Sequence, residues 1–249
     1  MHVTGVTNKG KERPRNEDSC YAVQDSNLAL LVVADGMGGH KAGNVASEIA
    51  VSTAEKYWKS INRDKPLSDQ EAKDLVRDLI IEANQSVISE ADNSFDKRGM
   101  GTTLTVGLLS GNRLTIGHIG DSRAYLVNSD RIELLTRDHS LLEQLIESGQ
   151  VKPEEAKNHP KRHVLTRALG ASSKLQIDII DYDIEPGSAL LFCTDGLTNL
   201  VEDHEILTVV TGQKDPQLQA ESLIALANAR GGHDNITVVI AADIGGQKV

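Results

Sequence analysis

Apolar runs of strand length end or begin at an aspartate beside a turn or a glycine-rich break at several places along the chain. These aspartates are Asp18, Asp35, Asp121, Asp195 and Asp234. A strand end is a rigid place for a side chain, and neighbouring glycines let the backbone approach a bound ion. Mg²⁺ and Mn²⁺ require several oxygen ligands in a defined geometry. The chain must therefore fold so that distant strand ends meet, and we predict one metal centre where they do.

Strands and helices are predicted in separate groups. Strand-like runs occupy 2–7, 18–24, 28–34, 102–109, 113–119, 123–128, 131–135, 175–184, 188–193 and 235–242. Apolar residues at three-to-four spacing predict helices at 42–61, 70–92, 198–210 and 215–229. Ser68 and Glu71 are typical of a capping box that starts the second helix. Runs of strands without intervening helices pair antiparallel, which favours α+β layering over alternating βαβ units.

Antiparallel pairing explains how the aspartates meet. Asp35, Asp121 and Asp195 are predicted at the carboxyl ends of strands, and Asp18 and Asp234 at the amino ends. In an antiparallel sheet the start of one strand shares a rim with the end of its neighbour. We therefore expect all five carboxylates at one edge of the sheets.

The stretch 139–162 differs from its surroundings. A short helical pattern at its start is followed by Gly149, Pro153 and Pro160 among charged residues. We interpret it as a partly ordered flap inserted between strands. No repeat, glycine- and serine-rich linker or low-complexity stretch divides the chain, so residues 1–249 are predicted to form a single domain with this flap as a subdomain.

Composition narrows the class of protein. The formal net charge of −10 argues against nucleic acid or an anionic membrane as partner, because both require a basic face. No apolar stretch is long enough to cross a bilayer, and the first residues lack the apolar core of a signal peptide. Cys20 and Cys193 fall inside predicted strands, as small buried residues do in a reducing compartment. We expect a cytoplasmic protein.

Other phosphate-handling motifs are absent from the sequence. Residues 35–43, DGMGGHKAG, lack the Gly-Lys-Ser/Thr ending of a P-loop, and Lys41 stands where the third glycine of a dinucleotide fingerprint belongs. There is no Gly-x-Ser-x-Gly nucleophile elbow and no paired cysteine or His-x-x-x-His zinc motif. A single Asp-Gly is usually only a turn. The recurrence of aspartates is what favours metal binding.

Two further side chains are candidates for the site. Arg13, three residues before Asn16, belongs either to a solvated charged loop or to a phosphate clamp, since a guanidinium matches two phosphate oxygens. Beside a metal centre the clamp is favoured. His40 is near Asp35 in the sequence and is a candidate proton donor.

Six motifs together resemble a known family. They are Arg13-x-x-Asn16-Glu17-Asp18, Asp35-Gly36-Met37-Gly38-Gly39, Gly101-Thr102-Thr103, Gly120-Asp121-Ser122-Arg123, Asp195-Gly196-Leu197 and Asp234-Asn235. Their types and order are similar to those of the metal-dependent serine/threonine protein phosphatases of type 2C, in a compact bacterial form. The resemblance runs from about residue 4 to residue 242.

The resemblance implies a four-layer αββα sandwich, in which two antiparallel sheets are flanked by pairs of helices, and a site for two Mg²⁺ or Mn²⁺ ions at one edge. The resemblance implies that Asp35 bridges the two metals, that the carbonyl of Gly36 binds one of them, and that Asp195 and Asp234 bind the other. Glu17 and Asp18 would hold the metals directly or through water, and Asp121 with Asp195 would bind a third ion where one is present. Arg13 would bind the substrate phosphate, and Asn235 would support the site. Residues 139–167 would be the flap.

The implied reaction is direct hydrolysis of phosphoserine and phosphothreonine on proteins by a metal-activated water, by a monomer that opposes a bacterial serine/threonine kinase. Many eukaryotic relatives have a histidine directly after the Asp-Gly, where this chain has Met37, which is common among bacterial members. His40, another side chain or a metal-bound water must then protonate the leaving oxygen, unless that step proceeds unaided. Two alternatives remain: a phosphatase for small phosphate esters, and a non-catalytic module that binds phosphoproteins. The presence of every expected ligand favours catalysis.

Overall fold

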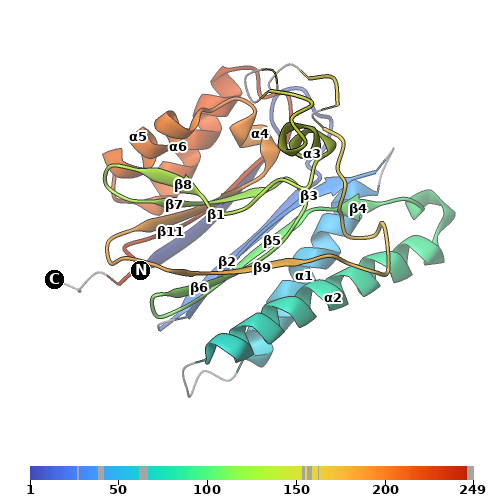
Figure 1. The fold of residues 1–249 in the computed structure, drawn as a ribbon, viewed down its shortest axis with the longest axis horizontal. Coiled ribbons are helices and arrows are strands. Elements are labelled where there is room, and N and C mark those ends of the chain that lie inside the picture. The colour runs from blue at the N-terminus through green and yellow to red at the C-terminus, as the bar shows by residue number, and fades with distance from the viewer. Residues whose placement is uncertain are drawn as a thin grey trace.

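Two antiparallel β-sheets pack face to face at the centre of the fold, and helices cover both outer faces (Figure 1). The computed structural model describes residues 1–26, 28–38, 42–61, 67–152, 155, 159–161 and 163–245. The predicted α+β sandwich of four layers is confirmed.

The first sheet has the strand order β2-β3-β5-β6-β9. Its strands are β2 (Asp18–Asp25), β3 (Leu28–Met37), β5 (Leu104–Ser110), β6 (Arg113–Ile119) and β9 (Asp178–Asp183). The short strand β4 (Gly101–Thr102) pairs with the end of β3, opposite Gly36 and Met37. This extra pairing lengthens β3 beyond its apolar run.

The second sheet has the order β1-β11-β10-β7-β8. Its strands are β1 (His2–Asn8), β11 (Ile236–Ala242), β10 (Ala189–Cys193), β7 (Arg123–Val127) and β8 (Ile132–Leu134). The first and last strands of the chain therefore lie side by side. Cys20 in β2 and Cys193 in β10 are free thiols, as predicted.

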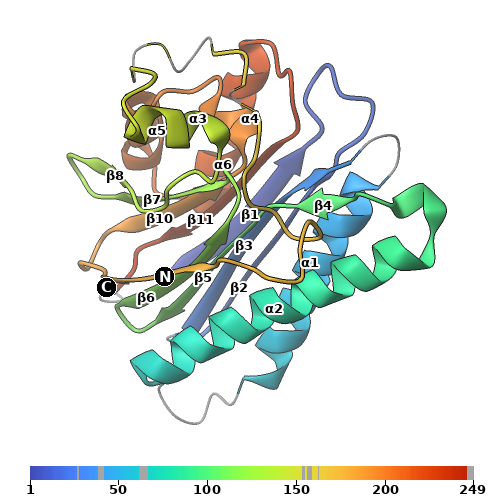
Figure 2. The same ribbon diagram turned by 45° about the vertical axis from the view of Figure 1, so that its right-hand side comes forward.

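Helices α1 (Gly43–Ser60) and α2 (Asp69–Asn93) cover the first sheet, and a short 3₁₀ turn, η1 (Phe95–Lys97), follows α2. Helices α4 (Asp195–Thr198), α5 (Asp203–Gly212) and α6 (Pro216–Ala229) lie over the second sheet (Figure 2). The predicted capping box is present at α2: Ser68 Oγ accepts from the Glu71 N–H, and the Glu71 carboxylate accepts from the Ser68 N–H. Among the described helices, none combines the length and apolar character needed to cross a bilayer.

Side chains alternate between the two faces of β3. Leu30, Val32 and Ala34 pack against α1 and α2, whereas Leu31 and Val33 face the second sheet. Gly107 on neighbouring β5 leaves room for the ring of Phe192 from the other sheet, because a Cβ there would lie 2.4 Å from that ring. The layer between the sheets is thus closely packed and almost entirely aliphatic.

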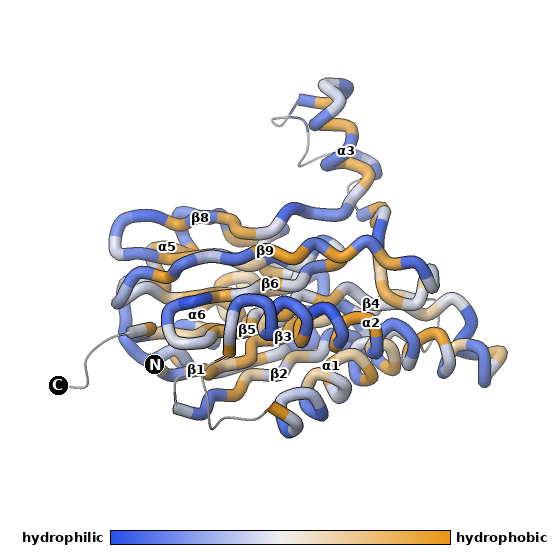
Figure 3. The backbone as a smooth tube through the Cα atoms, turned by 60° about the horizontal axis from the view of Figure 1, so that its bottom comes forward, coloured by the Kyte–Doolittle hydropathy of each residue, from blue (hydrophilic) through white to orange (hydrophobic). Residues whose placement is uncertain are grey.

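The described part of residues 139–167 contains α3 (Leu141–Glu147), which extends beyond the layers of the sandwich, as Figure 3 shows at the α3 label. The two ends of the segment run antiparallel: Ser140 bridges to Leu165, and the Leu141 N–H donates to the Val164 carbonyl. We call residues 139–167 the α3 segment. Its function as a flap stays a prediction.

Three local predictions need correction. Asp35 lies inside β3 rather than at its end, because β4 continues the pairing to Met37. The helix predicted at 198–210 is divided, with α4 beginning at Asp195 and α5 at Asp203. The strand predicted from 175 begins at Asp178, where pairing with β6 starts.

Candidate metal centre

Asp18 and Asp35 lie directly opposite each other on β2 and β3. Asp35 follows Leu31 and Val33 on the face of β3 that points to the second sheet. Its side chain therefore stands at the open end of the layer between the two sheets, where a carboxylate replaces the aliphatic residues of the core.

The backbone of Asp35 is fixed by the Thr102-Thr103 pair. The Asp35 N–H donates to Thr103 Oγ1 at 2.9 Å, and the Asp35 carbonyl accepts from the Thr103 N–H and from Thr102 Oγ1, each at 2.9 Å. Thr103 Oγ1 is also 2.8 Å from Ser122 Oγ. One threonine thus connects β3 to the turn that carries Asp121.

Asp18 joins the two sheets beneath the site. Its Oδ2 accepts hydrogen bonds from Thr194 Oγ1 at 2.8 Å and from Thr237 Oγ1 at 2.7 Å, and both threonines belong to the second sheet or its edge. The residue is buried, with 7% of its surface exposed. Asp18 therefore links β2 of the first sheet to two threonines of the second sheet or its edge, next to the site.

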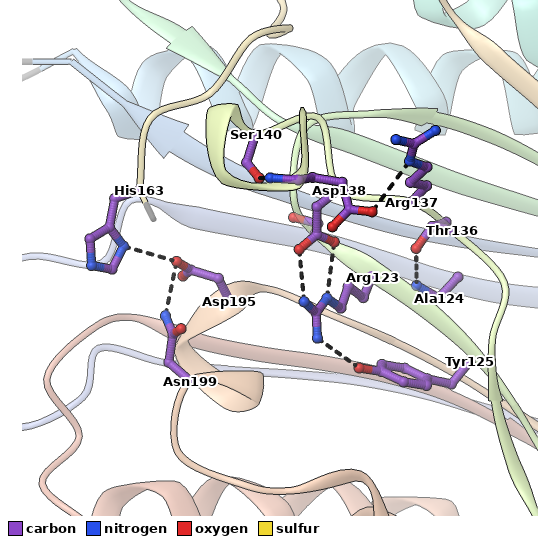
Figure 4. A network of polar contacts seen from close by, with 12 residues as sticks. Arg123, Ala124, Tyr125, Thr136, Arg137, Asp138, Ser140, His163, Asp195 and Asn199 are labelled. Carbon is purple, nitrogen blue, oxygen red and sulfur yellow. Dashed lines mark hydrogen bonds and ion pairs between the residues drawn. The ribbon is translucent and has the colours of Figure 1, made fainter. Parts of the chain in front are cut away.

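Asp195 and Asp234 approach from the second sheet. Asp195 is the first residue of α4, and its Oδ2 accepts from Asn199 Nδ2 at 3.1 Å (Figure 4). Its Oδ1 is buried and has no hydrogen-bond partner among the described residues. Asp234 accepts from the Asn235 N–H at 2.8 Å and from Arg13 Nη2 at 2.8 Å.

Asn235 organises the loop that carries the N-terminal candidates. Its Oδ1 accepts from the Glu17 N–H at 2.8 Å, and its Nδ2 donates to the carbonyls of Lys9 and Arg15 at 2.9 and 2.8 Å. This one amide holds both ends of the loop against β11. The supporting role predicted for Asn235 is consistent with these contacts.

A cavity of about 670 Å³ lies between these groups. The predicted site residues that line it are Arg13, Glu17, Asp35, Gly36, Asp121, Asp195, Asp234 and Asn235. Asp18 lies behind the wall. His40 is outside the described residues.

Gly36 has no room for a side chain. A Cβ at this position would lie 2.2 Å from the Gly43 carbonyl oxygen and 2.5 Å from that of Glu17. The Gly36 N–H donates to the Glu17 carbonyl at 3.1 Å. Close backbone packing here brings the start of α1 and the Glu17 loop to the floor of the cavity.

The carboxylates repel one another in an apolar setting. Burial, followed by the charges of Asp18 and Asp195, raises the pKa of Asp35 well above its usual range. Burial raises the pKa of Asp18 to about 7, against the stabilising hydrogen bonds from Thr237 and Thr194. Burial, with the charge of Asp195, raises the pKa of Asp121 to about 8. The pKa of Asp195 is raised as well, by burial and then by Asp234.

These residues fit a divalent cation. The donors are hard oxygen atoms, one buried carboxylate oxygen has no partner among the described residues, and the described lining of the cavity holds one Arg beside several carboxylates. In the described part of the chain, no three His, Cys, Asp or Glu side chains close around a single point. The carboxylates instead line the wall of a shared cavity.

The Asp121 turn is braced from outside. Arg123 forms a two-point ion pair with Asp138, with Nε and Nη2 donating at 2.9 and 2.7 Å, and its Nη1 lies 3.3 Å from Tyr125 Oη (Figure 4). Thr136 Oγ1 accepts from the Ala124 N–H at 3.1 Å. That Asp121 holds a third ion stays a prediction.

Five residues that line the cavity were not predicted as site residues: Met37, Gly38, Thr103, His163 and Leu165. Met37 and Gly38 belong to the predicted Asp-Gly motif. His163 Nδ1 lies 3.9 Å from Asp195 Oδ2. Thr103 had a signal, since it belongs to the Gly-Thr-Thr motif. His163 and Leu165 had none, because they reach the cavity only through the path of the α3 segment.

Comparisons with known proteins find relatives that match nearly the whole chain. The model of the family described as protein phosphatase 2C matches residues 7–225. The serine/threonine phosphatase stp of Listeria welshimeri is 37% identical over 241 residues, which cover 96% of this chain and 95% of the relative. The protein phosphatase PhpP of Streptococcus pneumoniae is 36% identical over 243 residues, with 97% of each chain covered.

Solved structures are similar over the same extent. The serine/threonine phosphatase PstP/Ppp of Mycobacterium tuberculosis has a TM-score of 0.87 and 36% identity, with 97% of each chain covered. A PstP catalytic domain solved in complex with two manganese ions has a TM-score of 0.84 and 33% identity, again with 97% of each chain covered.

Proposed function

The chain belongs to the protein phosphatase 2C family and is a serine/threonine protein phosphatase, and we propose that phosphorylated proteins are hydrolysed in the cavity between Asp35 and Asp195. The observation that carries this proposal is the set of carboxylates from both sheets around one cavity with Arg13 at its rim. Negative charge gathered in this way suits a cation-dependent reaction on a phosphate ester.

We propose that Asp35, Asp195, Asp234 and Glu17, with the Gly36 carbonyl, hold two Mn²⁺ or Mg²⁺ ions, and that Asp121 with Asp195 holds a third. The unpartnered Oδ1 of Asp195 and the raised pKa of Asp35 support these assignments. When bound, such ions activate water for attack on phosphorus and neutralise phosphate charge.

Arg13 is proposed to bind the substrate phosphate. Its guanidinium is half exposed at the cavity rim, and it carries a planar fork of donors that matches two phosphate oxygens. One nitrogen of this fork, Nη2, donates to Asp234 Oδ2, so a phosphate bound through Nη2 competes with this contact. Arg13 would then orient the phosphate and stabilise the charge that shifts during hydrolysis.

Asp18 is proposed to hold a metal directly or through water, as the resemblance implies, and Asp18 and Asn235 are also proposed to position other groups. Asp18 accepts from Thr194 and Thr237 and faces Asp35, so it holds the edges of the two sheets at a constant separation. Asn235 places Glu17 and the Arg13 loop. Neither needs to contact phosphate.

The α3 segment is proposed to act as a flap that helps to select the substrate, because His163 and Leu165 bring it to the cavity wall. We propose a monomer as the active form. We further propose that the enzyme works in the cytoplasm and opposes a bacterial serine/threonine kinase.

The test is phosphate release from a phosphothreonine peptide by metal-stripped protein, with Mn²⁺ or Mg²⁺ added back. We expect turnover only with added cation, and at least about 100-fold less turnover for Asp195→Asn, since even changes beside metal ligands cost 10–100-fold. A small aryl phosphate measured in parallel separates the two substrate classes. Metal-independent turnover, or wild-type turnover by Asp195→Asn, would overturn the proposal.

A further inference from the structure

Both backbone polar groups of Gly120, the residue before Asp121, bond to His139. The Gly120 N–H donates to His139 Nδ1 at 3.1 Å, and the Gly120 carbonyl accepts from the His139 N–H at 2.7 Å. Gly120 has φ +115° and packs against Thr103, so the turn has little freedom of its own. The direction in which Asp121 leaves β6 therefore depends on His139.

The other side of the same imidazole reaches the far end of the α3 segment and β9. His139 Nε2 lies 3.1 Å from Asp178 Oδ2, and Arg167 Nη1 donates to Asp178 Oδ1 at 2.8 Å and lies 3.0 Å from Nε2. The Thr166 N–H donates to the His139 carbonyl at 2.8 Å. Both ends of the α3 segment thus meet at one residue.

The protonation state of His139 follows from its partners. Nδ1 accepts from the Gly120 N–H, so the neutral ring carries its proton on Nε2 and donates it to Asp178. The side chain is 5% exposed, and burial lowers its pKa, which favours the neutral ring. Nδ1 and Nε2 therefore bond to different partners, and each bond can be removed separately by replacing the nitrogen that makes it.

Neighbouring side chains brace the Asp121 turn without reaching the returning end of the α3 segment: the Arg123–Asp138 pair and the Thr136–Ala124 hydrogen bond both lie on the side of the turn. The two ends of the segment are also joined by the Ser140–Leu165 bridge and the Leu141–Val164 hydrogen bond, neither of which involves Gly120. The tilted ring of His118 lies beside His139 with 4.7 Å between ring centroids, yet its own bonds go to Thr105 and to the Arg137 carbonyl.

We propose that His139 is a positioning residue that couples the α3 segment to Asp121, with Nδ1 setting the Asp121 turn and Nε2 setting the base of the segment. This inference rests on the proposed function, in which Asp121 binds a cation and the α3 segment covers the cavity. Movement of the segment at its base and the position of the Asp121 carboxylate would then change together.

Two near-isosteric substitutions separate the two nitrogens. In His139→Asn the amide oxygen takes the place of Nδ1, which keeps the Gly120 bond and loses Asp178. In His139→Gln the amide nitrogen takes the place of Nε2, which keeps Asp178 and loses Gly120. His118→Gln removes a buried imidazole whose hydrogen bonds go to Thr105 and the Arg137 carbonyl rather than to Gly120 or Asp178, and it serves as the matched control.

The measurements are Mn²⁺ binding by titration calorimetry on metal-stripped protein and amide hydrogen exchange of residues 141–151. His139→Gln should weaken binding of one Mn²⁺ about tenfold, the usual effect of losing a group behind a metal ligand, with exchange unchanged. His139→Asn should bind Mn²⁺ like wild type but exchange faster in the segment. Asp178→Asn, a milder change at a half-exposed residue, should match His139→Asn.

The proposal is overturned if both His139 variants change binding and exchange in proportion to their loss of thermal stability, as His118→Gln would, or if Asp178→Asn leaves exchange unchanged. Neither readout requires turnover. A wild-type protein that binds Mn²⁺ but does not hydrolyse phosphopeptides would end the functional proposal and leave this test in force.

Discussion

Arg13 Nη2 donates to Asp234 Oδ2 across the mouth of the cavity at 2.8 Å. The side chain proposed to bind phosphate is therefore paired with a carboxylate proposed to bind metal. Arg13 and Asp234 are 51% and 31% exposed, and ion pairs this exposed contribute about 0–1 kcal/mol. A divalent cation at Asp234 competes with so weak a pair easily, and its binding would free the guanidinium for substrate.

Arg13→Ala should therefore have two opposite effects. Mn²⁺ should bind up to about fivefold more tightly, because Asp234 no longer has a competing partner. KM for a phosphothreonine peptide should rise more than kcat falls, because the phosphate loses its clamp. Calorimetry and steady-state kinetics measure the two effects.

Arg15→Ala is the control for the loss of a cation from the same loop, since Arg15 contacts Asn235 through its carbonyl. It should leave both quantities close to wild type. A fall in kcat alone for Arg13→Ala would contradict the phosphate-binding role.

Asp35→Asn should stabilise the metal-free protein while stopping catalysis. The substitution removes a carboxyl group that is buried among other carboxylates, where its pKa is raised because its ionised form is unfavourable. Thermal unfolding without metal should occur at higher temperature than in wild type, and turnover with Mn²⁺ should fall by more than about 100-fold. Asp130→Asn, at an exposed position, should change neither. An inactive variant that is also less stable would mean that Asp35 serves the fold.

The metal-free protein should lose stability from its carboxylates as pH rises. Burial raises the pKa of Asp121 to about 8 in the folded protein, above the ordinary 3.8, so the folded state retains a proton that the unfolded chain releases. The amount by which Asp121 lowers the free energy of unfolding is zero below about pH 4. It grows up to about pH 8, by at most about 1.4 kcal/mol per pH unit.

Denaturant unfolding of wild type and Asp121→Asn across this range tests the sign. The free energy of unfolding of Asp121→Asn, relative to that of wild type, should rise with each step up in pH. Saturating Mn²⁺ should remove this difference. Burial lowers the pKa of His118 to about 4, which favours folding as pH rises towards 6.5, but this contribution is common to both proteins and cancels. A difference that is constant with pH would refute the raised pKa.

Gly36→Ala should disturb the site through the backbone. Its Cβ would meet the carbonyl oxygens of Gly43 and Glu17 at 2.2 and 2.5 Å, so main chain must move. We expect a loss of about 1–3 kcal/mol in the free energy of unfolding, as in other overpacked sites, together with weaker Mn²⁺ binding. Gly212→Ala, in α5 with open space around it, should be neutral or slightly stabilising. Equal effects of the two substitutions would show that packing at Gly36 is unimportant.

Local patterns predicted most elements because the signals for them are local. The apolar run of β3, the three-to-four spacing of α2 and the Ser68–Glu71 box each depend on residues a few positions apart. The predicted end of a strand was wrong where a strand that is distant in the sequence pairs with it. β4 extends β3 through Asp35 to Met37, and no pattern within residues 28–37 records that pairing.

The site shows the same division. The residue pattern predicts which carboxylates belong together, because each stands beside a strand and a turn or glycine break. How they are held is visible only in the folded protein: Asp18 opposite Asp35, its bonds to Thr194 and Thr237, the Arg13–Asp234 pair, and His163 at the wall. These contacts join residues far apart in the chain, and their geometry depends on how two sheets pack, which a pattern along one strand does not encode.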